Sequence, residues 1–500
     1  MNRLPHPFHR VIRNTGFQGL TFGSLALSNA IIVIAVGRIA GPDKLGSLSF
    51  AITVTLLGSI LGDLGIGMLL TREASRRREQ AESVATLTGN GLAISMLLGL
   101  LMVAAANLVA PFVGVSPESI AGIKIVAVGV GFSTLSSILK GVFYAYEKMH
   151  YETVYIVLQE VMYVALALVF LSVSLPFVWI FWAYSGSRLV GLIVALIIYR
   201  SRIGPLRLSF TWPVWRTLIW QGLPFAANSA LALVYIRSDV ILLGLLAGSV
   251  AVGIYEAGAV VGVRANVVAR MVTNSMLPSL ARDYPPKVSG FETKIMAVMR
   301  YLLLMGVPMS IVLATFSSEI IALFYGEQFR ASVLIFAILA IVIPLRFLSN
   351  VLATGLTASN AQGRRTLAVF VASVVNVVLN LLLIPVYSYL GAAISSVVTE
   401  LCLFLILFYF LRRRIAFAVR VAHLHPFVIL LILVCPTALV LNSVLPGWVA
   451  ASGGMAAYFL VAWRLILTSG ERAYLKGAVL RGACLLGIGT SGSNPAGGSS

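Results

Sequence analysis

The sequence predicts an all-α integral membrane protein with about fourteen transmembrane helices and no aqueous domain of any size. Of its 500 residues, 59% are hydrophobic and only 11% are charged, and the mean hydropathy is +0.98. A soluble domain has about 45–50% apolar and about 25% charged residues. The apolar residues form blocks of about 18–25 residues, which is the length of a helix that crosses a bilayer. A water-soluble fold could not bury this much apolar surface.

The first apolar block covers residues 16–40. It is too long for a signal peptide and has no small-residue cleavage site, so we expect it to remain as the first helix. Thirteen further blocks follow, separated by short loops. The loops of the first half lie at residues 41–44, 72–78, 111–118, 147–152, 171–176 and 200–216. Those of the second half lie at residues 247–250, 282–294, 317–330, 364–365, 387–390, 412–420 and 442–447.

Every second loop is basic. The net charge of +19 comes from 36 Lys and Arg against 17 Asp and Glu, and these basic residues gather in alternate loops, for example at Arg76, Arg77 and Arg78. The positive-inside rule then places both termini in the cytoplasm and makes the number of helices even. The same rule explains the high net charge, so no nucleic-acid partner is expected.

Two pairs of short segments indicate an internal repeat. Residues 140–145 resemble residues 354–359, and residues 45–49 resemble residues 252–255. Six helices separate the members of each pair, so the halves have the same orientation, as in parallel transporter repeats. Chance similarity between apolar segments remains the alternative. The predicted chain begins with a cytoplasmic tail at 1–15, which is followed by an N-terminal six-helix bundle at 16–200, a cytoplasmic linker at 201–214 and a C-terminal six-helix bundle at 215–412. Two further transmembrane helices at 426–468 and a partly disordered cytoplasmic tail at 469–500 complete it.

Several motifs resemble those of polysaccharide flippases of the multidrug/oligosaccharidyl-lipid/polysaccharide (MOP) exporter superfamily. They are residues 37–46, residues 61–67, Arg72-Glu73, Gly222-Leu223-Pro224, Asp239, Gly253-Ile254-Tyr255 and residues 324–329. The likeness covers about residues 14–412. It implies a MATE-like fold that translocates an oligosaccharide repeat unit, linked to undecaprenyl pyrophosphate, from the inner to the outer leaflet of a bacterial inner membrane. It also implies a polysaccharide polymerase and a chain-length regulator as candidate partners besides the membrane lipids.

Basic residues outnumber acidic ones within the predicted helices. The basic ones are Arg38, Lys124, Lys140, Arg188, Arg237, Arg264, Arg270, Arg300, Arg346 and Arg464, and the acidic ones are Asp63, Glu160, Asp239, Glu256 and Glu400. A basic group in the middle of a lipid-facing helix costs at least about 2.5–3.5 kcal/mol, so such groups usually face a cavity or a partner. Lys124, Lys140, Arg300 and Arg464 lie near helix ends, where the side chain can reach the headgroups.

The deeper arginines are candidate ligands for an anionic cargo: Arg38, Arg188, Arg237, Arg264, Arg270 and Arg346. Guanidinium groups bind pyrophosphate in a bidentate manner, and two rocking bundles would give alternating access. Structural ion pairs are the alternative role. Arg237 and Asp239 lie about 200° apart around a helix, so they cannot pair with each other there, and one of them needs a partner on another helix.

Intramembrane carboxylates often relay protons, so Asp63, Glu160, Asp239 and Glu400 are candidates for ion coupling, although Asp63 belongs to the family-like motif and has a structural alternative. No nucleotide-binding loop and no metal-like Cys/His spacing is present; His423 and His425 fit a cytoplasmic loop. We therefore expect no cofactor and no enzymatic activity. A MATE-like drug/cation antiporter and a membrane-embedded glycosyltransferase or polymerase remain alternatives.

Overall fold

A computed structural model describes residues 7–284, 288–415, 452–456 and 458. Within these residues, every regular element is a helix. The elements are α1 (Pro7–Asp63), α2 (Ile66–Arg76), α3 (Ala81–Val109), η1 (Ala110–Phe112), α4 (Pro117–Ala145), α5 (Met149–Ser172), α6 (Val178–Arg202), α7 (Trp212–Leu246), α8 (Gly248–Asp283), α9 (Val288–Thr315), α10 (Ser317–Tyr325), η2 (Glu327–Phe329), α11 (Ser332–Ile341), α12 (Ile343–Ala358), α13 (Gln362–Tyr387) and α14 (Tyr389–Ile415). The all-α membrane class is confirmed.

Nine of the described helices are long and apolar enough to cross a membrane, and the number rises to eleven when each of two bent pairs is counted as one span. The predicted total of fourteen stays a prediction. Most of residues 426–468, which contain Arg464 and the last two predicted helices, lie outside the described residues, as do His423, His425 and the tail from residue 469.

The helix α1 contains the first two predicted spans. Its 57 residues would be about 85 Å long if straight, far more than the bilayer core. It breaks at Gly41, which has a φ of 86° that glycine adopts without strain, and the next residue is Pro42. The predicted turn at residues 41–44 is therefore present, and the chain reverses there.

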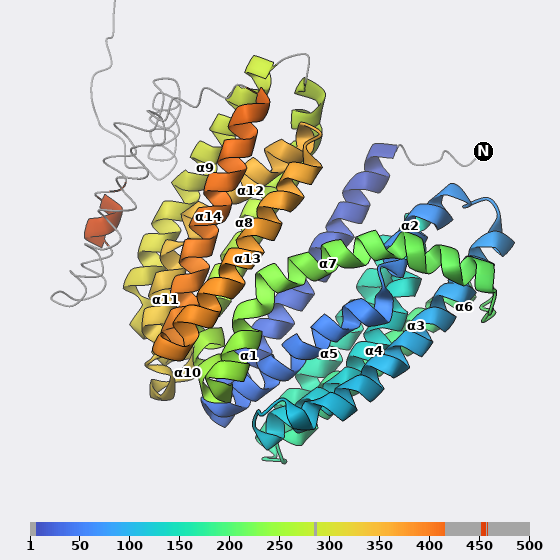
Figure 1. The fold of residues 1–500 in the computed structure, drawn as a ribbon, viewed down its shortest axis with the longest axis horizontal. Helices are drawn as coiled ribbons and strands as arrows, with labels where there is room; N and C mark the ends of the chain where they lie inside the picture. The colour runs from blue at the N-terminus through green and yellow to red at the C-terminus, as the bar shows by residue number, and fades with distance from the viewer. Residues whose placement is uncertain (1–6, 285–287, 416–451, 457, 459–500) are drawn as a thin grey trace, which may run out of the picture.

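Two groups of helices form the arms of a V (Figure 1). One arm contains α2 to α6, the other contains α9 and α11 to α14, and α7 crosses from the first arm towards the joined end of the V. Among the described helices, α1 and α8 have the most extensive contact of any pair. These two helices therefore link the arms.

Three hydrophobic cores follow this arrangement. One core lies within each arm, and the third combines residues of both halves, such as Val36 and Leu45 from α1 with Val252 and Tyr255 from α8 and Phe336 from α11. The halves thus share a core only at the joined end. We call the other ends of the arms the free ends, because no common core joins them.

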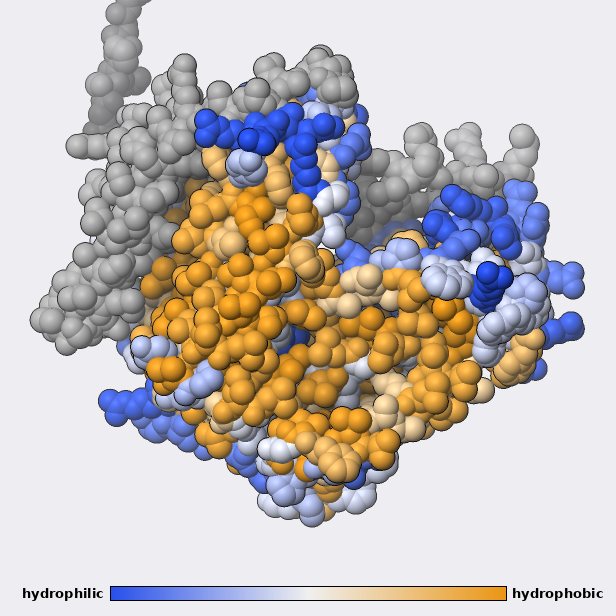
Figure 2. Space-filling model, in the orientation of Figure 1, coloured by the Kyte–Doolittle hydropathy of each residue, from blue (hydrophilic) through white to orange (hydrophobic). Residues whose placement is uncertain are grey.

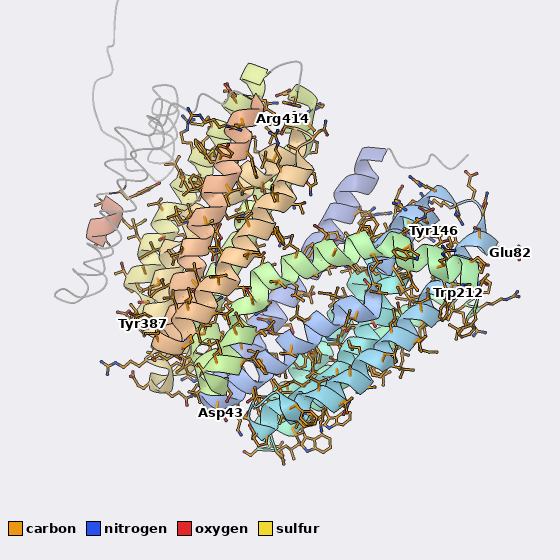
Figure 3. The ribbon with its side chains drawn as sticks, in the orientation of Figure 1. Asp43, Glu82, Tyr146, Trp212, Tyr387 and Arg414 are labelled. Atoms are coloured by element: carbon orange, nitrogen blue, oxygen red, sulfur yellow. The ribbon has the colours of Figure 1, made fainter. Side chains whose placement is uncertain are left out.

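The two kinds of predicted loop separate in space. Glu82, Tyr146, Trp212 and Arg414 lie towards the free ends of the arms, whereas Asp43 and Tyr387 lie at the joined end (Figure 3). Between these ends, hydrophobic residues cover most of the face that Figure 2 shows, on both arms, and hydrophilic residues gather at the extremities. The free ends carry the loops that the sequence predicts to be cytoplasmic.

Candidate functional site

An arginine and a glutamate form a buried pair inside the first arm. Arg188 Nη1 on α6 lies 2.5 Å from Glu160 Oε1 on α5, and the two side chains are only 12% and 5% exposed. The Arg188 guanidinium also lies 4.5 Å from the centre of the Tyr184 ring. A pair packed this closely within one arm has the geometry of a structural ion pair, which is the alternative role given above for the arginines within the helices.

A second set of charges belongs to the other half. Arg237 Nη1 on α7 lies 2.7 Å from Glu256 Oε1 on α8. Asp239, two residues further along α7, accepts hydrogen bonds from the Tyr255 hydroxyl and from the backbone amide of Val240. The inference that one of Arg237 and Asp239 needs a partner on another helix is therefore confirmed, and in the structure both have a partner on α8.

This set extends to α12 and α14. Arg346 Nε lies 3.5 Å from Glu400 Oε2, and the Tyr235 hydroxyl on α7 donates a 3.1 Å hydrogen bond to the same carboxylate oxygen. The Tyr255 hydroxyl lies 3.1 Å from Ser396 Oγ on α14. We call these residues the C-half network: Tyr235, Arg237, Asp239, Tyr255, Glu256, Arg346, Ser396 and Glu400. It joins four helices and contains two arginines and three carboxylates.

Arg38 and Arg270, like Arg188, lie apart from this network. Arg38 is exposed and donates to the backbone carbonyl of Leu323, and Arg270 is exposed on α8. Arg264 is part of α8, but its side chain lies outside the described part of the molecule. Of the five predicted arginines whose side chains the structure describes, Arg237 and Arg346 belong to this network.

The contacts of Asp63 fit a structural role rather than ion coupling. It ends α1, and its carboxylate accepts hydrogen bonds from the Gly67 amide at 3.1 Å and the Ser137 hydroxyl at 3.0 Å. Between it and α2, Leu64 and Gly65 have φ values of 44° and 71°, so the backbone leaves the helical path there. The carboxylate thus holds the start of α2 against α4.

Sequence reasoning missed Glu152. It was assigned to a loop, but it lies in the first turn of α5, is 1% exposed, and pairs with Lys140 Nζ at 2.6 Å. The Tyr144 hydroxyl and the Gln18 side-chain amide donate to its other oxygen at 2.6 and 2.9 Å. Lys140, expected to reach the headgroups, instead pairs with this buried carboxylate. No spacing in the sequence connects these four residues, which come from α1, α4 and α5.

The two repeat motifs meet at the joined end. A Cβ atom added to Gly46 would lie 1.7 Å from the backbone oxygen of Ser249, and one added to Gly253 would lie 1.9 Å from that of Pro42. Only glycine permits two helices to approach so closely. The Ser249 hydroxyl also donates to Asp43, and the Gln328 side-chain amide donates to the Gly37 carbonyl at 3.0 Å. Backbone packing therefore closes this end.

Among the residues that the structure describes, no three His, Cys, Asp or Glu side chains are grouped to hold a metal ion. The described site thus consists of pairs of arginine and carboxylate side chains on the helices of a V that is closed at one end. Such an arrangement is typical of transporters that open to one side of the membrane at a time.

Comparisons with known proteins agree with this architecture. A solved structure of lipid II flippase MurJ in an inward closed conformation is 13% identical, with a TM-score of 0.70 over 89% of this chain and 98% of that one. An inward-facing multidrug resistance MATE family transporter of the MOP superfamily is 14% identical, with a TM-score of 0.66 over 78% and 94%. A MOP superfamily transporter from Pyrococcus furiosus is 14% identical, with a TM-score of 0.55 over 81% and 95%.

The fold is thus that of a multi-pass membrane transporter of the MOP superfamily. A family model described as "Polysaccharide biosynthesis protein" matches residues 11–282, more than half of the chain, so the chain belongs to that family. A second model, described as "Lipid II flippase MurJ", matches residues 229–458. No curated protein sequence matches the chain significantly. The predicted kinship with polysaccharide flippases of this superfamily is confirmed.

Proposed function

We propose that this protein translocates an undecaprenyl-pyrophosphate-linked oligosaccharide repeat unit from the inner to the outer leaflet of the bacterial cytoplasmic membrane by alternating access. The observation that carries the proposal is the V, whose arms meet at Gly46 and Gly253 and diverge towards the basic ends (Figure 1). With the basic ends in the cytoplasm, this conformation admits a cargo from the inner leaflet.

The C-half network supplies the anion-binding groups of this proposal. Arg237 and Arg346 are partly exposed, at 30% and 21% of their side-chain surface, whereas their partners Glu256 and Glu400 are more deeply buried. A pyrophosphate that reaches the guanidinium groups replaces the carboxylates as their hydrogen-bonding partner, and bidentate binding favours this exchange. Arg38, Arg188, Arg264 and Arg270 then have positioning or structural roles.

The same exchange offers a route to ion coupling. When an arginine leaves its carboxylate for the cargo, the carboxylate loses its compensating charge and favours binding a proton. Glu400, which pairs with Arg346, is the coupling residue that we propose. Asp239 is held by the Tyr255 hydroxyl and a backbone amide rather than by an arginine, so the cargo does not release it. Glu160 stays bound to Arg188 and Asp63 stays bound to backbone, so neither is released by the cargo. A polymerase and a chain-length regulator would act on the product in the outer leaflet.

Deletion of the gene in its host tests the proposal. We expect the lipid-linked repeat unit to accumulate in the inner leaflet and surface polysaccharide to fall. Unchanged polysaccharide without retained intermediate, in a strain with no second flippase, would contradict the proposal. Loss of resistance to organic cations with unchanged polysaccharide would favour a drug/cation antiporter.

A further inference from the structure

A hydrophobic groove runs between α7 and α13 on the face shown in Figure 2. Its volume is about 670 Å³, and its α7 wall includes Ala227, Leu231 and Val234. Phe370 and Val374 line the opposite wall on α13. At its inner end, the Ser238 hydroxyl donates a 2.7 Å hydrogen bond to Asn376, so the two helices touch there and separate towards the free ends. The groove is therefore a wedge that opens in the same direction as the V.

A basic pocket adjoins this groove at the free end of α7. Its volume is also about 670 Å³, and it shares Pro224 with the groove. The other residues that line it are Arg72, Glu73, Arg76, Trp220, Gln221 and Phe225. The hydrophobic groove and the basic pocket thus adjoin at Pro224 of α7.

The pocket holds its arginines in place. Arg72 donates from Nη2 to Gln221 Oε1 at 2.8 Å, and its guanidinium lies 5.9 Å from the centre of the Phe225 ring. Glu73 contacts Arg72 at 3.0 Å and Arg76 at 3.5 Å. Two arginines against one glutamate leave a net positive charge, which suits an anionic group.

One face of α7 connects the two sites. Trp220, Pro224, Ala227, Leu231 and Val234 recur at intervals of four and three residues, so they form a single stripe along the helix. Fourteen residues of helix span about 21 Å. The stripe thus runs from the charged pocket well into the hydrophobic part of the molecule.

We propose that this composite site binds the lipid part of the cargo: Arg72 and Arg76 hold the pyrophosphate, and the α7–α13 groove receives the first part of the polyprenyl chain. The inference rests on the proposed function for the identity of its ligand. A long apolar chain that carries a pyrophosphate at one end matches a long apolar groove with a basic pocket at one end. The site lies on the open side of the V, where it would meet the cargo before the C-half network does.

The test measures binding rather than transport. The full-length protein, in nanodiscs of a neutral phospholipid, is titrated with undecaprenyl pyrophosphate, inorganic pyrophosphate and phosphatidylglycerol. Ala227→Trp fills the groove, Ala104→Trp places the same side chain on the exposed face of α3, and Arg72→Gln weakens the pocket. We expect Ala227→Trp to weaken binding of undecaprenyl pyrophosphate at least tenfold and to leave inorganic pyrophosphate unchanged. Arg72→Gln should weaken both, and Ala104→Trp neither.

Unchanged affinity for undecaprenyl pyrophosphate in Ala227→Trp would overturn the inference. Equal binding of phosphatidylglycerol, lost to the same extent in that variant, would also overturn it, because the groove would then be a general lipid site. If Ala227→Trp also loses binding of inorganic pyrophosphate, the variant is misfolded. Leu231→Phe, which adds less volume to the groove, then replaces it in the same test. The proposed function fails separately, through a deletion strain with normal polysaccharide, whatever the affinities.

Discussion

Gly46 of α1 and Gly253 of α8 lie backbone to backbone at the joined end of the V, where a Cβ on either residue would overlap a backbone oxygen of the other helix. They belong to the two segments, 45–49 and 252–255, that the sequence pairs as a repeat. The repeat thus places a glycine from each half at the same contact. We regard this contact as the gate that closes the outer side.

Gly46→Ala and Gly253→Ala should open the gate. A methyl group forced against backbone costs about 1–3 kcal/mol, which corresponds to a shift of about 5- to 150-fold towards the conformation open at the joined end. The measurement is labelling of Leu48→Cys, a position that is 2% exposed in the shared core, by a membrane-impermeant maleimide after the native cysteines are replaced. Gly186→Ala is the matched control, because nothing lies within 4 Å of its added Cβ. Equal labelling in all variants would show that this contact is no gate.

The pair of Arg188 and Glu160 should contribute stability rather than cargo binding. Arg188→Ala leaves a buried carboxylate without its partner and should lower the free energy of unfolding by about 3–5 kcal/mol. The double variant Arg188→Met with Glu160→Leu should regain most of this loss and retain transport, as seen by thermal unfolding in detergent and by export. A stable double variant without export would assign the pair to the transport site.

Arg237→Ala and Arg346→Ala should reduce transport without loss of protein. A hydrogen bond to a charged group contributes about 1.5–3 kcal/mol, so each variant should transport about 10- to 150-fold more slowly. Arg346→Lys keeps the charge but loses the bidentate geometry, and should be intermediate. The assay is export of the repeat unit at matched expression, with the exposed Arg412→Ala as control. Full export in both alanine variants would remove the network from cargo binding.

Glu152 should hold α1, α4 and α5 together. Lys140→Met leaves the buried Glu152 carboxylate without its cation and should lower the free energy of unfolding by about 3–5 kcal/mol, whereas Lys140→Met with Glu152→Leu should recover most of it. Thermal unfolding of the purified variants measures both. Identical stability of the wild type and the single variant would contradict the structural role of this pair.

The sequence predicts the helical spans well because their causes are local. Block length and the Gly41-Pro42 break are enough to place the first two spans, and the loop charges separate the two ends of the molecule. Charge pairing depends on tertiary packing, so the sequence can exclude a partner but cannot identify one. Helix geometry excludes a pair between Arg237 and Asp239, but nothing local indicates Glu256 as the partner of Arg237. The polar neighbours of Glu152 suggest a loop, whereas its burial arises from α1, which is distant in sequence, and from the packing of α4 against α5 after the turn between them.

The most direct test of the central claim is translocation by the purified protein. Proteoliposomes are prepared with an undecaprenyl-pyrophosphate-linked oligosaccharide that carries a fluorescent sugar, and an impermeant quencher measures the fraction in each leaflet over time. We expect the wild type to move the lipid between the leaflets, and the double variant Arg237→Ala with Arg346→Ala to do so much more slowly. Leaflet exchange no faster than in protein-free liposomes, under every ion gradient applied, would contradict the central claim.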